Sequence, residues 1–142
     1  MPAEVFLDAS YAVALSSSRD LHHARAVSLA ERLKQASTRL LTTRAVVLEI
    51  GNALARLRHR EAAIRLLEAI DSDPQVEIVP LSDDLYRQAF DLYRSRPDKE
   101  WGLTDCMSFT VMQDRGLVDA LTADEHYRQA GLRALLLEEP GP

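Results

Sequence analysis

The sequence predicts an α/β protein, a three-layer α/β/α sandwich with a central parallel sheet. Five short apolar segments typical of buried strands alternate with segments whose apolar residues recur at helical spacing. Parallel strands need long crossover connections, and helices in those connections cover both faces of a sheet. The 142 residues contain no repeat or linker, so we expect one domain over residues 1–142 with a frayed tail from about residue 138.

The first half of the chain contains two of these strands. The expected elements are a strand at residues 5–7, a helix at 20–36, a strand at 38–43, and helices at about 44–58 and 60–70. Asp20 and Thr43 are N-cap candidates for the first two helices, and Asp8 is expected in a turn. Leu21 and Leu57 are assigned to the apolar stripes of these helices.

The second half of the chain repeats the alternation. The expected elements are a strand at residues 76–81, a helix at 83–93, a polar loop, a helix within 102–116, a strand at 117–123, a short helix from 124 and a strand at 132–137. Ser82 opens the first of these helices, Gly116 ends the second and Asp124 starts the third. The patterns leave the order of the strands in the sheet open.

Composition excludes several classes of protein. No segment approaches the length of a membrane span, and the N-terminus lacks the basic region of a secretory signal. The single cysteine, Cys106, cannot form an internal disulfide, so we expect a cytoplasmic protein. The net charge of −5 argues against broad non-specific binding to nucleic acid, although fifteen arginines suit local contacts with phosphate.

Four acidic residues are expected near one edge of the sheet. Asp8 and Asp124 follow strands, Asp105 opens a helix, and Glu49 lies in the second turn of another helix. Folds of this class bind ligands outside the carboxyl ends of their strands. Like charges at about 4 Å repel by about 1 kcal/mol in water and about 4 kcal/mol at an effective dielectric of 20. A divalent cation would relieve that repulsion, and oxygen ligands suit Mg²⁺ or Mn²⁺.

Each of these acids also has a purely structural interpretation. Asp105 fits the first turn of a helix, where the helix dipole stabilises a negative charge. Asp124 fits a helix N-cap, Asp8 a turn, and Glu49 a solvated helix surface. The pattern alone leaves both interpretations open.

Four segments carry a family resemblance: "VFLDAS", "LEIGNAL", "LTDCMSF" and "LTADEHYRQAG". In these segments the chain resembles the PIN-domain ribonucleases, and most of all the stand-alone VapC-type toxins of bacterial toxin–antitoxin pairs. The resemblance spans nearly the whole chain and includes the four acids in the family's order. It implies the α/β/α sandwich and a catalytic, metal-binding set of Asp8, Glu49, Asp105 and Asp124. It also implies that Thr104 belongs to the catalytic set, and Asn52 matches a common polar helix position.

The resemblance implies a metal-dependent endoribonuclease that hydrolyses RNA phosphodiester bonds as the toxin of a type II pair. Asp8 and Asp105 would bind Mg²⁺ or Mn²⁺ directly, while Glu49 and Asp124 would bind a second ion or hold water. Hydrolysis would leave a 5′-phosphate and a 3′-hydroxyl. The implied partners are an RNA substrate, a cognate antitoxin that covers the acidic cleft, and a second copy in a homodimer, with no membrane.

Other functions fit parts of the same pattern. The alternatives are a catalytically inactive PIN-fold binding or regulatory module and a housekeeping RNA-processing nuclease. A phosphate-transferring enzyme with Asp8 as nucleophile is disfavoured, because Ser10 stands where such enzymes need a second acid. Cys106 is interpreted as a small buried residue, since no histidine is placed to activate it. For His126 an ordinary polar role is favoured over proton transfer.

Overall fold

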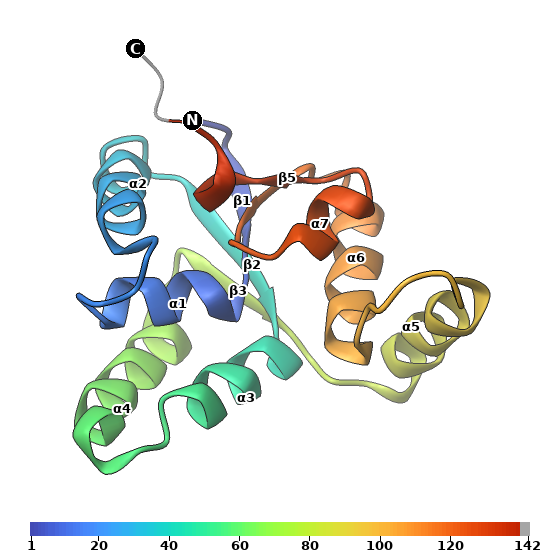
Figure 1. The fold of residues 1–142 in the computed structure, drawn as a ribbon, viewed down its shortest axis with the longest axis horizontal. Helices are drawn as coiled ribbons and strands as arrows, with labels where there is room; N and C mark the ends of the chain where they lie inside the picture. The colour runs from blue at the N-terminus through green and yellow to red at the C-terminus, as the bar shows by residue number, and fades with distance from the viewer. Residues whose placement is uncertain (140–142) are drawn as a thin grey trace.

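The computed structural model, which describes residues 1–139, is the predicted α/β/α sandwich (Figure 1). Its five strands are all parallel and lie in the order β3-β2-β1-β4-β5. The strands are β1 (Glu4–Leu7), β2 (Arg39–Thr43), β3 (Val76–Val79), β4 (Asp119–Leu121) and β5 (Arg133–Ala134). The helices are α1 (Ala9–Ser16), α2 (His23–Gln35), α3 (Arg44–Ala53), α4 (Leu57–Ser72), α5 (Asp83–Ser95), α6 (Leu103–Arg115), α7 (Glu125–Gln129) and the 3₁₀ helix η1 (Leu135–Leu137).

The strand order divides the sheet into two halves that the chain builds in opposite directions. From β1 the chain moves outward to β2 and β3, and it then crosses back to place β4 on the other side of β1. Figure 1 shows α1, α2 and α4 on one side of the sheet and α5, α6 and α7 on the other. The direction of winding therefore reverses between β1 and β4, where ligands bind in folds of this class.

The core joins the sheet to α6 and α7. The β1 residues Val5 and Phe6 are fully buried, as expected for a central parallel strand. On α6, the ring of Phe109 makes edge contacts with Trp101 and Tyr127, at centroid separations of 5.1 and 5.0 Å. These aromatic contacts fix α7 against α6.

Several predicted helix ends are confirmed by their capping contacts. The Thr43 hydroxyl accepts the backbone N–H of Val46 at the start of α3, and the Ser82 hydroxyl accepts that of Leu85 at the start of α5. Gly116 ends α6 in the left-handed conformation, at φ 66°. Cap chemistry is local, which is why the sequence predicts these ends.

The segment after β1 differs from the prediction. Asp8 does not sit in an isolated turn but caps the start of α1, and the next helix starts at His23 rather than at Asp20. Helix α1 is apolar on most sides and largely buried, so its sequence lacks the amphipathic period that reveals a helix. Asp20 instead accepts the backbone N–H of His22 in a turn, which leaves Leu21 90% exposed.

Further boundaries, in the α3–α4 connection and at the last strand, were also predicted wrongly. Helix α3 ends at Ala53, and Leu57 begins α4 with 91% of its surface exposed instead of closing the α3 stripe. The Arg60 guanidinium donates to the Ala55 carbonyl at 2.9 and 2.7 Å, which stabilises this turn between the helices. The last predicted strand covers only Arg133–Ala134, because the following leucines form η1.

The C-terminal segment is described as far as residue 139. Glu138, in the segment expected to fray, forms an ion pair with Arg133, whose guanidinium also pairs with Asp119. Residues 140–142 of the expected tail lie outside the described residues. Within residues 1–139 no helix is both long enough and apolar enough to cross a membrane.

Candidate active site

The predicted acidic residues lie at the carboxyl edge of the sheet, around the reversal between β1 and β4. Asp8 directly follows β1, and its backbone N–H donates to the Leu121 carbonyl at the end of β4. Asp124 follows β4 by three residues and caps α7. Asp105 lies in the first turn of α6, and Glu49 lies on α3, which starts where β2 ends. Four distant segments thus bring carboxylates to one region.

Asp8 is the most tightly held of the four acids. Only 6% of its surface is exposed. One carboxylate oxygen, Oδ2, accepts the hydroxyls of Thr122 at 2.7 Å and Ser10 at 2.8 Å, and the other accepts the hydroxyl of Tyr127 at 3.1 Å. Burial, followed by the charge of Asp8, raises the pKa of Tyr127 well above its usual value, so the phenol stays a neutral donor.

The same hydroxyls tie Asp8 to the loop that carries Asp124. The Ser10 hydroxyl accepts the backbone N–H of Ala123, and the Thr122 hydroxyl accepts that of Asp124, both at 3.0 Å. Each hydroxyl therefore donates to Asp8 while accepting from the β4–α7 loop. This network fixes the loop relative to the end of β1.

Asp105, Asp124 and His126 form the tightest group of possible metal ligands in the described part of the chain. One ligand atom from each lies within 4.8 Å of the other two. His126 Nδ1 is 3.0 Å from Asp105 Oδ2 and 3.4 Å from Asp124 Oδ1. The two carboxylates therefore converge on one imidazole nitrogen.

Glu49 lies outside this tight group but close enough to feel its charge. The pKa of Glu49 is raised by partial burial of its carboxyl, by the charge of Asp8 and, more weakly, by Asp105 and Asp124. A hydrogen bond from Thr104 acts in the opposite direction. Thr104 on α6 therefore lies near enough to Glu49 on α3 to affect its pKa, while Glu49 and Asn52, one turn farther along α3, are both exposed residues.

Three of the acids also act as helix caps, so their structural interpretation holds alongside the functional one. Asp8 accepts the backbone N–H of Ser10 in α1, Asp105 accepts that of Gly102 before α6, and Asp124 accepts that of His126 in α7. Helix N-termini carry partial positive charge and stabilise nearby carboxylates. The helix ends and hydroxyls therefore offset part of the repulsion between the carboxylates. From the sequence, a cation alone was expected to relieve this repulsion.

The pKa of Asp105 reflects both its burial and the repulsion from neighbouring carboxylates. Burial raises the pKa of this carboxyl, and the charges of Asp124 and Asp8 raise it further. Hydrogen bonds from His126 and from the Gly102 backbone lower it, but the net direction is upward. A cation bound among these carboxylates would favour their charged forms.

Cys106, next to Asp105, is a buried structural residue, as the sequence predicts. It is fully buried, and burial together with the charge of Asp105 raises the pKa of its thiol to about 11. Because the thiolate is the reactive form, we expect Ellman's reagent at pH 8 to leave Cys106 unmodified in the native protein and to modify it in urea. Rapid modification of the native protein would contradict this assignment.

The sequence did not predict which residues hold the acids in place, and for His126 it favoured an ordinary polar role. Ser10, Thr122 and Tyr127 hold Asp8, and His126 joins Asp105 to Asp124. Three of them lie within the segment that contains Asp124, so polar residues beside a strand-end acid were the available signal. The contacts of Thr122 and Tyr127 with Asp8, and of His126 with Asp105, join residues more than twenty positions apart in sequence. They depend on the packing of α7 and the loop before it.

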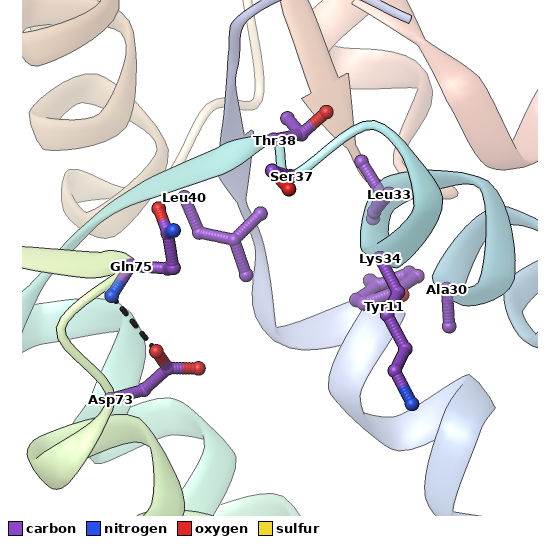
Figure 2. A pocket seen from close by; sticks show the side chains of 9 residues that line it. All are labelled: Tyr11, Ala30, Leu33, Lys34, Ser37, Thr38, Leu40, Asp73 and Gln75. Carbon is purple, nitrogen blue, oxygen red and sulfur yellow. Dashed lines mark hydrogen bonds between the residues drawn. The ribbon is translucent and has the colours of Figure 1, made fainter.

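A separate hollow of about 350 Å³ lies at the opposite, amino-terminal edge of the sheet (Figure 2). Figure 2 shows Asp73 and Gln75 on one side of it and Tyr11 with Lys34 on the other. It contains a single carboxylate, and Asp73 accepts the Gln75 backbone N–H at 2.8 Å. The hollow is distinct from the acidic site.

Comparison with known proteins identifies the family. The model of the PIN domain family matches residues 5–132. The chain is 27% identical over 127 residues to the 23S rRNA-specific endonuclease VapC20 of Mycobacterium tuberculosis, in strains CDC 1551/Oshkosh and H37Rv, covering 89% of this chain and 94% of the relative. The crystal structure of M. tuberculosis VapC20, described as a Sarcin-Ricin loop cleaving toxin, superposes with a TM-score of 0.78 at 27% identity, over 91% of this chain and 96% of that one. The sandwich, its acidic edge and these matches show that the chain belongs to the PIN domain family.

Proposed function

We propose that this chain is a metal-dependent endoribonuclease and the toxin of a toxin–antitoxin pair. The observation that carries the proposal is that Asp105 and Asp124 lie together at the reversal between β1 and β4, with Asp8 at the end of β1 near enough to affect the pKa of Asp105. The similarity to VapC20, an rRNA-specific endonuclease, supports RNA as the substrate class. The same similarity supports a cognate antitoxin as partner.

The donor set fits a hard divalent cation such as Mg²⁺ or Mn²⁺. Asp105 and Asp124 offer oxygens close to one another, and Asp8 and Glu49 border the same site. Carboxylate oxygens are the ligands that these ions prefer. When bound, the ion supplies positive charge for the phosphate oxygens and lowers the pKa of a coordinated water.

Residues of this chain would hold the site rigid and orient the attacking water. Asp8, fixed by three hydroxyls, provides a rigid anchor at the base of the site. Glu49, an exposed carboxylate close enough to Asp8 for the charge of Asp8 to raise its pKa, would orient the attacking water by accepting its hydrogen bond. Water attacks phosphorus, the bond to the 3′ oxygen breaks, and the products carry a 5′-phosphate and a 3′-hydroxyl.

The experiment is cleavage of ribosomal and transfer RNA by the purified chain, free of antitoxin, in Mg²⁺, in Mn²⁺ and in EDTA. We expect fragments with 5′-phosphate and 3′-hydroxyl ends in either metal, and none in EDTA. Equal cleavage in EDTA, or products with 2′,3′-cyclic phosphate ends, would contradict the proposal. An RNA untouched in both metals would also contradict an endoribonuclease of these substrates.

A further inference from the structure

We propose that His126 is itself a metal ligand, so that the site binds its ion through a nitrogen as well as through oxygens. The inference rests on the proposed metal dependence and deepens it. It assigns a residue outside the four acids, and it predicts that the site favours a transition ion such as Mn²⁺ over Mg²⁺.

The spacing of the donor atoms matches that around one ion. Two ligands at right angles, each roughly 2.1 Å from an octahedral ion, lie roughly 3 Å apart. His126 Nδ1 is 3.0 Å from Asp105 Oδ2 and 3.4 Å from Asp124 Oδ1. Nδ1 therefore already stands at about the separation from each carboxylate oxygen that adjacent ligand positions require, and the three groups lie within 4.8 Å of one another.

The imidazole is held in place by backbone and core contacts. The His126 backbone N–H donates to Asp124 Oδ1 at 2.9 Å, which fixes the start of α7. The next residue, Tyr127, is fully buried, packs on Phe109 and donates its hydroxyl to Asp8. A ligand anchored in this way loses little conformational entropy when an ion binds.

A hydrogen bond alone does not account for the arrangement equally well. Nδ1 carries at most one proton, which can be aimed well at a single acceptor. Here two carboxylates, Asp105 and Asp124, approach that one nitrogen. A positive ion shared by all three groups satisfies both carboxylates and the nitrogen lone pair together.

The chemistry of the donors predicts the metal preference. Imidazole nitrogen binds first-row transition ions more strongly than it binds Mg²⁺, which prefers carboxylate and water oxygens. His126→Asp replaces the nitrogen with an oxygen donor at the same position. His126→Ala removes the donor altogether, and His22→Ala, at the position just before α2, serves as the control.

The test uses metal binding to the purified full chain. Pulsed EPR of the Mn²⁺ complex reports a coordinated histidine nitrogen directly, and calorimetry gives the affinities for Mn²⁺ and Mg²⁺. We expect the nitrogen signal in the wild type and in His22→Ala but not in either His126 variant. We also expect His126→Ala to weaken Mn²⁺ binding about 10-fold or more, and His126→Asp to lower the ratio of Mn²⁺ to Mg²⁺ affinity by a similar factor.

The outcomes separate this inference from the proposed function. Mn²⁺ bound to the wild type without a nitrogen signal, or an affinity ratio unchanged in His126→Asp, overturns the role of His126 and leaves metal dependence standing. Absence of Mn²⁺ and Mg²⁺ binding to the wild type overturns both. Circular dichroism of each variant confirms that the comparison is between folded proteins.

Discussion

We expect Asp105→Asn to lower the rate of RNA cleavage by about 100-fold or more, while the folded protein stays at least as stable as the wild type at neutral pH. The loss of activity follows from the neutralisation of a carboxylate that lies against both Asp124 and His126. The retained stability follows from the pKa of Asp105, which burial and neighbouring acids raise. An amide still accepts the Gly102 N–H but carries no charge to repel.

The sign of the stability effect can be checked against pH. Because the pKa of Asp105 is higher in the folded than in the unfolded chain, the folded state holds its proton more tightly. The contribution of this group is therefore complete at low pH and is lost as pH rises through the folded pKa. The advantage of the Asn variant should accordingly vanish below about pH 4, where the aspartate is protonated in both states.

The matched control is Asp114→Asn, an exposed aspartate near the other end of α6. Urea unfolding at several pH values gives the stability of both variants, and gel analysis of labelled RNA gives the cleavage rate. We expect the control to match the wild type in both measurements. Cleavage by the Asp105 variant at the wild-type rate would remove this residue from the catalytic machinery.

Asp8→Ala lowers the free energy of unfolding by about 2–4 kcal/mol. The substitution removes the acceptor for the hydroxyls of Ser10, Thr122 and Tyr127 at a site that is almost completely buried. Buried donors left without an acceptor each carry a desolvation penalty of about 1–3 kcal/mol, and partial relaxation reduces the sum. The midpoint of urea unfolding measures the change.

Two further variants identify the cause. Asp8→Asn keeps one carbonyl oxygen for the hydroxyls and should be destabilised less than Asp8→Ala. Tyr127→Phe removes one donor, so combining it with Asp8→Ala should cost less than the sum of the single changes, by about 1 kcal/mol. Strict additivity would show that Asp8 and Tyr127 are not coupled, and Asp114→Ala controls for loss of an exposed aspartate.

The sequence predicted the acids of the candidate site but not the contact of His126 with them. Asp8 and Asp124 could be assigned to one edge because each follows a strand, and parallel strands end at the same edge. Asp105 and Glu49 were placed at the same edge from their positions near helix starts, and the family resemblance assigned all four acids to a metal site. Metal binding by the four acids is a proposal, and the Asp105 variant above tests one of them. For His126 the sequence favours an ordinary polar role, and the contact of its imidazole with Asp105 is seen only in the structure. Asp124 is an N-cap with an extended backbone, at φ −89° and ψ 120°, and its carboxylate lies 3.4 Å from His126 Nδ1.

By itself the sequence determined the fold class, several of the helix ends and the edge where the acids lie. These features depend on local chemistry: hydrophobic period, capping residues and the position of each acid after a strand. Only the tertiary structure decided the strand order, the buried helix α1 and the convergence of Asp105, Asp124 and His126. These features arise from packing between segments that are far apart in sequence, such as Phe109 against Tyr127. No single segment contains the information that specifies such contacts.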